Sequence, residues 1–221
     1  MTVGDFFWQR LWDWGVRRVF GYPGDGINGL LGALRRRGGD IDFVQVRHEE
    51  MAAFMAVAHA KFTGEIGVCL ATSGPGAAHL LTGLYDARAD HMPVLAIVGQ
   101  QARTALGSHY QQEIDLVSMF KDVAGDHVHT VTVPAQVRHL TDRAMRAAIG
   151  QRRVSALIFP NDLQELDYAD PPRAHGSVFS GVGYAPPVVV PQEADLRRAI
   201  NHRDFLPFYQ PIRRMDDGRV I

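Results

Sequence analysis

The alternation of short apolar segments with helical segments over residues 3–160 constrains the fold of this chain more than any other feature. Helical spacing predicts helices over residues 3–14, 27–37, 50–62, 77–89, 114–120 and 135–149. Short apolar runs predict strands over residues 17–20, 42–46, 67–71, 94–98, 127–133 and 155–159. Strands that alternate with helices in this way form a parallel sheet covered on both faces. We therefore predict an α/β fold with a doubly wound, mostly parallel sheet.

Composition narrows the class of protein. With 221 residues, of which 46% are hydrophobic, the chain can bury one substantial core. The net charge of −1 and the absence of a long basic run argue against nucleic acid or an anionic membrane as a partner. No stretch has the pattern of a signal peptide or a membrane span, and Cys69 is the only cysteine. The expected compartment is therefore the cytoplasm.

The periodic pattern stops well before the end of the chain. We predict a first domain over residues 1–163, a proline-rich irregular linker over residues 164–194, and a separate fragment over residues 195–221. The fragment is expected to contain a short helix over residues 193–201, and it is too short to form a core of its own.

Glu49 lies where the third predicted helix begins, directly after a strand. A carboxylate in the first turn of a helix can serve only to complement the helix dipole. However, the helix over residues 50–62 is apolar on nearly every side, so we expect it to be buried. Burial disfavours the charged form of a carboxyl group, which suits a group that exchanges a proton near neutral pH. Glu49 is therefore a candidate catalytic residue.

Two glycine-rich loops also follow predicted strands. Gly24, Gly26 and Gly29 form the G-x-G-x-x-G pattern of dinucleotide-binding sites, which leaves a Rossmann-type NAD(P)-dependent oxidoreductase as an alternative. Pro23 before this pattern, and a second turn at residues 74–76, are not features that dinucleotide binding requires. A third possibility is a non-catalytic dimerisation or interaction remnant.

Four segments together resemble the pyrimidine-binding (PYR) domain of thiamine-diphosphate enzymes, with pyruvate oxidase and acetolactate synthase as the most similar types. The segments are residues 19–26, 47–49, 71–76 and 110–115, and the resemblance extends over about residues 1–190. It implies an enzyme that acts on 2-oxo acids such as pyruvate. The sequence does not distinguish an oxidase from a synthase or a decarboxylase.

The resemblance also implies roles for individual residues. Glu49 matches the glutamate that contacts N1′ of the cofactor's aminopyrimidine and so activates the cofactor. Gln112 matches the glutamine that faces the substrate. The walls of the pyrimidine pocket match Pro23, Gly24, Thr72 and Pro75, while His79 stands where many relatives carry asparagine. No residue of this chain is predicted to be a metal ligand.

The same resemblance implies partners outside this sequence. In the family, a separate domain holds the cofactor's diphosphate and Mg²⁺, and a second subunit completes the active site, so a homodimer or homotetramer is expected. In the oxidases a further domain carries FAD. Residues 195–221 instead resemble the start of an EAL-type cyclic-di-GMP phosphodiesterase domain.

Overall fold

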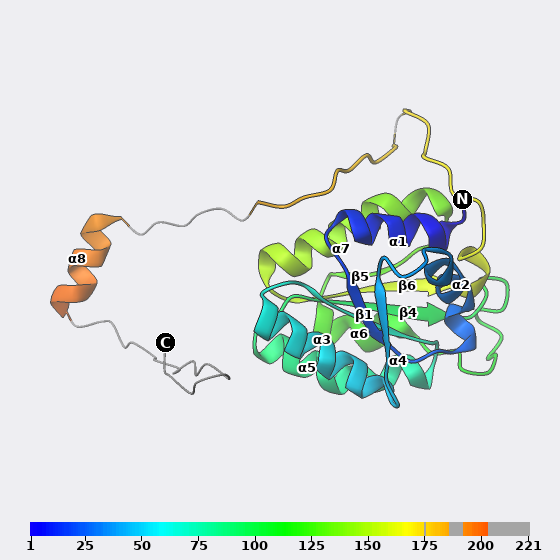
Figure 1. Cartoon of the computed structure of the whole chain (residues 1–221), viewed down its shortest axis with the longest axis horizontal. Helices are drawn as coiled ribbons and strands as arrows, with labels where there is room; N and C mark the ends of the chain where they lie inside the picture. Colours follow the sequence, from blue (N-terminus) through cyan, green and yellow to red (C-terminus); the bar gives the residue numbers. More distant parts are fainter. Residues whose placement is uncertain (175, 186–191, 203–221) are drawn as a thin grey trace. The chain divides into compact units, whose positions relative to one another are not determined.

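The computed structural model describes residues 1–174, 176–185 and 192–202 (Figure 1). The chain divides into two units, Met1–Tyr184 and Ala185–Ile221. In the second unit the described part contains α8 (Glu193–His202), which confirms the predicted helix. The rest of the segment that is expected to resemble an EAL-type domain, residues 203–221, lies outside the described residues. None of the described helices is long and apolar enough to cross a membrane.

The first unit is built on a six-stranded sheet in the order β2-β1-β3-β4-β6-β5. All five pairs of neighbouring strands are parallel, which confirms the predicted doubly wound α/β fold. The strands are β1 (Arg18–Gly21), β2 (Asp42–Gln45), β3 (Gly67–Ala71), β4 (Val94–Gln100), β5 (Val128–Thr130) and β6 (Val154–Pro160).

Helices cover both faces of this sheet (Figure 1). One face carries α1 (Val3–Asp13), α2 (Asn28–Arg36) and α7 (Val137–Gln151). The other face carries α3 (Glu49–Thr63), α4 (Pro75–His79), α5 (Leu81–Ala89) and α6 (Leu116–Ala124). Single turns of 3₁₀ helix occupy Asp25–Ile27, Pro134–Gln136 and Asn161–Leu163.

The central strands are buried on both sides, and their side chains divide between two cores. In β4, Leu95 and Ile97 join the core under α1, α2 and α7, whereas Ala96 and Val98 join the core on the opposite face. This division follows from the two-residue period of a strand. It also explains why these strands appear in the sequence as continuous apolar runs.

The strand predicted over residues 127–133 is only Val128–Thr130, the helix predicted over residues 114–120 is Leu116–Ala124, and two further helices differ from the sequence-based expectations. The helix predicted over residues 77–89 is two helices, because Leu80 donates to the carbonyl of Ala77 at 3.2 Å and the chain tightens there. The helix predicted over residues 50–62 is not buried all round: Met51 is 48% exposed and Phe62 is 89% exposed. A helix in an outer layer buries only one face, and in α3 that face consists mainly of alanines.

The irregular residues that follow residue 163 begin inside the first unit, which extends to Tyr184. Gln164 is fully buried, and its amide donates to the carbonyl oxygens of Gly26 at 2.8 Å and Phe159 at 3.2 Å. Its side-chain oxygen accepts from the backbone N–H of Leu30 at 3.1 Å. Pro171 and Pro172 lie in this irregular stretch, which remains part of the first unit.

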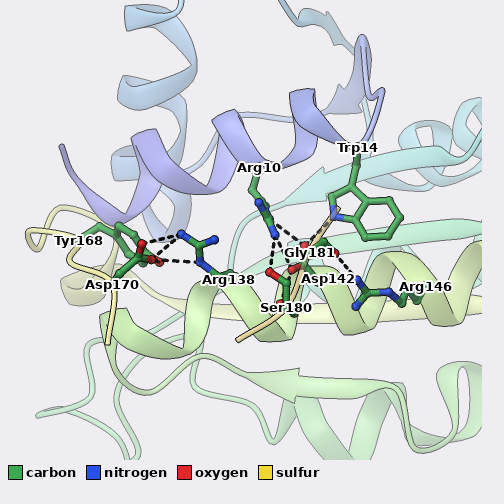
Figure 2. A network of polar contacts seen from close by, with 9 residues as sticks. All are labelled: Arg10, Trp14, Arg138, Asp142, Arg146, Tyr168, Asp170, Ser180 and Gly181. Atoms are coloured by element: carbon green, nitrogen blue, oxygen red, sulfur yellow. Dashed lines mark hydrogen bonds and ion pairs between the residues drawn. The ribbon is translucent and has the colours of Figure 1, made fainter. Parts of the chain in front are cut away.

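A buried ion pair fastens the later part of the same segment (Figure 2). Asp142 of α7 is fully buried and accepts from Arg10 of α1 at 2.8 and 2.7 Å and from the indole of Trp14 at 2.7 Å. The hydroxyl of Ser180 also donates to Asp142, and Arg10 donates to the carbonyl of Ser180 at 3.0 Å. One carboxylate thus joins two helices and the C-terminal segment of this unit.

We expect Asp142→Asn to lower the free energy of unfolding by about 3–5 kcal/mol, because it leaves the charge of Arg10 buried without a counter-ion. Asp170→Asn is the matched control. It breaks the more exposed ion pair with Arg138, which lies in the same network, and should cost about 1 kcal/mol or less. Urea unfolding measures both values, and equal losses would contradict the interpretation.

Histidines near β5 predict a dependence of stability on pH. Burial lowers the pKa of His129 below its ordinary value of 6.5, and the neighbouring Arg143 lowers the pKa further. The unfolded chain then takes up a proton more readily than the folded chain, so stability is lost as pH falls through about 6.5. Unfolding free energies at pH 7.5 and 5.5 should show this loss, and His129→Gln should reduce it. If the loss of unfolding free energy between pH 7.5 and 5.5 were the same in the variant as in the wild type, His129 would be ruled out as its cause.

Candidate functional site

The candidate site lies at the carboxyl ends of β1 and β3, which are neighbours in the sheet. The chain leaves β1 toward α2 on one face and leaves β3 toward α4 on the other. Such a divergence leaves a crevice where α/β proteins bind their ligands. A hydrogen bond of 2.9 Å from the backbone N–H of Gly26 to the Thr72 hydroxyl joins the two loops.

Glu49 is the first residue of α3 and is only 8% exposed. The side chain that caps this helix belongs to His48, which accepts from the N–H of Glu50 at 3.4 Å. The Glu49 carboxylate instead contacts His79 Nδ1 at 2.9 Å, and among the described residues it accepts from no backbone N–H. Glu49 therefore makes no described capping hydrogen bond to its own helix, although its place in the first turn still complements the helix dipole.

Glycine brings the second loop against this carboxylate. A Cβ placed on Gly76 would lie 2.6 Å from Thr72 Cγ2 and 3.0 Å from Glu49 Oε1. A Cβ on Gly24 would lie 2.6 Å from Thr72 Cβ. Contacts this short exclude any larger residue at either position. The structure thus brings together Gly24, Glu49, Thr72 and His79 from three separate segments of the chain.

Pro23 and Pro75 flank this group. Pro23 immediately precedes Gly24, and Pro75 is the first residue of α4, a position at which a missing N–H costs nothing. Both prolines stiffen the backbone of the loops that line the site.

Gln112 reaches the site from the long loop after β4. Gly74 adopts a φ of +61°, and a Cβ there would lie 2.7 Å from Gln112 Cβ. The hydroxyl of Ser73 lies 3.5 Å from Gln112 Oε1. The exposed Gln112 therefore packs against the second glycine loop, beside Gly74.

Sequence reasoning did not assign roles to three buried residues that support this arrangement. Ser73 is fully buried, and Gln101 donates to its hydroxyl at 3.2 Å. Gln100 in turn accepts from the N–H of Gln101 at 2.9 Å and donates to the carbonyl of Ile114 at 3.0 Å. The available signal was the pair of glutamines at the end of the apolar strand β4, because buried polar groups need partners.

His48 and His79 lie beside each other over Glu49. Their ring centroids are 4.4 Å apart with 32° between the ring planes, and both side chains are nearly half exposed. A buried carboxylate with an imidazole in hydrogen-bond contact can accept and pass on a proton, and the glycines beside it leave room for a flat ring.

The dinucleotide alternative does not fit this geometry. The N–H of Gly26 is bonded to Thr72 and its carbonyl accepts from Gln164, so this backbone is occupied where a pyrophosphate would need it. Gly29 packs against Gln164, with a hypothetical Cβ 2.6 Å from that side chain. The glycine pattern therefore serves close packing between the loop and the residues after β6.

Comparison with known proteins gives consistent results. The chain is 46% identical over 164 residues to a putative thiamine pyrophosphate-containing protein, YdaP, of Bacillus subtilis, an alignment that covers 73% of the chain and 28% of that protein. It is 43% identical to pyruvate oxidase of Lactiplantibacillus plantarum, over 68% of the chain and 25% of that enzyme. It is 41% identical to acetolactate synthase of Arthrospira platensis, over 78% of the chain and 30% of that enzyme.

The chain thus spans between about a fifth and a half of the length of the curated relatives it matches. Residues 1–119 match the family described as the thiamine pyrophosphate enzyme, N-terminal TPP binding domain, where TPP is thiamine diphosphate. This match confirms the resemblance seen in the sequence and gives no support to a dehydrogenase or a non-catalytic remnant. The chain belongs to the thiamine pyrophosphate enzymes, as an N-terminal thiamine-diphosphate-binding domain of the pyruvate oxidase and acetolactate synthase type.

Proposed function

We propose that Glu49 activates thiamine diphosphate by a hydrogen bond to N1′ of its aminopyrimidine. One observation carries this proposal: the Glu49 carboxylate is nearly buried at the switch point of the sheet and is not used to cap its own helix. When bound, the cofactor supplies a carbon nucleophile for attack on a 2-oxo acid. Glu49 would hold a proton at N1′ and so favour the tautomer that can deprotonate the cofactor.

The neighbouring residues fit a pyrimidine. Gly24 and Thr72 would form one wall of the pocket, and the prolines at 23 and 75 would keep the loops rigid around the ring. His79 would orient the Glu49 carboxylate through their 2.9 Å contact, in the place where many relatives carry asparagine. Gln112 would face the substrate, because it lies on the exposed side of the second glycine loop.

The complete enzyme is proposed to act on a 2-oxo acid such as pyruvate, in line with the names of two relatives. Mg²⁺ prefers oxygen ligands, whereas the predicted site residues form mainly a pocket for the pyrimidine ring. A further domain would therefore hold Mg²⁺ and the diphosphate of the cofactor. FAD would be required only in an oxidase. The proposed compartment is the cytoplasm, a proposal that rests on the single cysteine of the sequence.

A second subunit is proposed to complete the site. Support comes from α3, whose first residue is Glu49 and whose outer face exposes Met51 and Phe54. Tyr85 of the adjacent α5 is 43% exposed as well. Large apolar side chains grouped on neighbouring helices are typical of a surface that another chain covers. In this proposal residues 1–163 form the binding domain, residues 164–194 connect it, and residues 195–221 belong to a separate EAL-like fragment.

The role of Glu49 can be tested in a full-length relative. Replacing the glutamate equivalent to Glu49 with glutamine should slow deuterium exchange at C2 of the bound cofactor by about 10²-fold or more, since a general acid–base group is lost. Glu50→Gln is the matched control, because the Glu50 side chain is 44% exposed and should leave exchange unchanged. Nuclear magnetic resonance measures the exchange rate. Undiminished exchange in the Glu49 variant would refute the assignment.

The 221 residues alone are expected to fold but not to turn over pyruvate. The sheet has its own two cores, so cooperative unfolding should be seen. Asp25, in the only Gly-Asp-Gly of the sequence, accepts at 3.5 Å from the side-chain amide of Asn28, the first residue of α2. Without a diphosphate site, cofactor affinity should be roughly millimolar. A pyruvate assay with saturating cofactor and Mg²⁺ tests this, and sustained turnover would contradict it.

A further inference from the structure

We propose that His48, Glu49 and His79 form a binding site for a divalent transition-metal ion of the zinc class. Among the residues that the structure describes, these three are the one group of histidine, cysteine, aspartate or glutamate side chains whose ligand atoms all lie within 4.8 Å of one another. Glu49 and His79 are thirty residues apart in the chain, so sequence spacing alone did not predict a metal site.

The distances are close to those that a metal needs. Zinc binds nitrogen and oxygen at about 2.0–2.1 Å, which places tetrahedral ligands about 3.3 Å from one another. His79 Nδ1 and Glu49 Oε2 are already 2.9 Å apart. His48 must move by no more than about 1.5 Å to complete the set, judged from the same tetrahedral spacing. Its only described hydrogen bond is the 3.4 Å contact with the N–H of Glu50, which is weak enough to be given up.

The ligand types select the metal. Two imidazoles and one carboxylate suit zinc, nickel or copper, whereas magnesium and calcium prefer oxygen ligands. The carboxylate is nearly buried, while His48 and His79 are 46% and 44% exposed, so an ion can enter from the histidine side. That open side also leaves a coordination position for water.

Binding there would have a functional consequence. The metal would occupy the carboxylate of Glu49, and the pyrimidine of the cofactor could not then hydrogen-bond to it. Zinc should therefore exclude thiamine diphosphate, whereas magnesium should not. This consequence rests on the proposed function, but the metal site itself does not.

The test is calorimetric titration of the purified 221-residue chain with zinc chloride in a buffer that does not chelate metals. We expect one ion per chain at this site. His48→Asn and His79→Asn should each weaken binding at least tenfold, and magnesium chloride should bind at least tenfold more weakly than zinc. His91→Asn is the matched control that should change nothing. Asn is well tolerated at His91, whose φ is +52°.

Several results would overturn the proposal. Zinc affinity that is unchanged in both His48→Asn and His79→Asn would assign the ion to other histidines, and so would a loss of affinity in His91→Asn. No heat with zinc in the folded wild-type chain would also refute it. Circular dichroism shows whether each variant is folded, and cobalt(II) absorption in the visible region independently reports the ligand set. Because the metal is titrated without cofactor, failure here leaves the Glu49 exchange experiment unaffected.

Discussion

The close approach of α3 to the sheet is the constraint on which the candidate site depends. A Cβ on Gly67 of β3 would lie 2.1 Å from the carbonyl oxygen of Ala56, and one on Gly83 of α5 would lie 2.6 Å from the Cβ of Ala53. Only glycine and alanine allow backbones to pack at these distances. Since Glu49 begins this helix, the same packing that holds α3 against the sheet determines where its carboxylate lies.

This packing also explains why α3 has two unlike faces. The alanines face inward, where space is short, and Met51 and Phe54 face outward. A helix that is apolar on both sides suits a protein whose outer face is covered by another chain. The carboxylate at the start of α3 therefore stands between an internal core and an exposed apolar surface, which fits a site that two subunits would share.

The segment after β6 contributes to the site from the opposite side of the sheet. Gln164 fills the space beside Gly26 and Gly29, and it satisfies backbone groups of the first glycine loop. Farther on, Ser180 reaches the buried pair of Arg10 and Asp142 (Figure 2). An irregular segment is thus held by polar contacts rather than by secondary structure, because its prolines cannot join a helix or an inner strand.

Sequence alone determined the parallel sheet, the order of helices and strands, and the three loops that carry Gly24, Glu49 and Thr72, because these follow from local periodicity and turn chemistry. It placed the limits of helices less well, as the break at Leu80 shows. Only the tertiary structure decided that His79 meets Glu49, that Gln101 supports Ser73, and that Met51 faces outward. Such contacts join residues far apart in the chain, so they depend on how the layers pack and not on any local pattern.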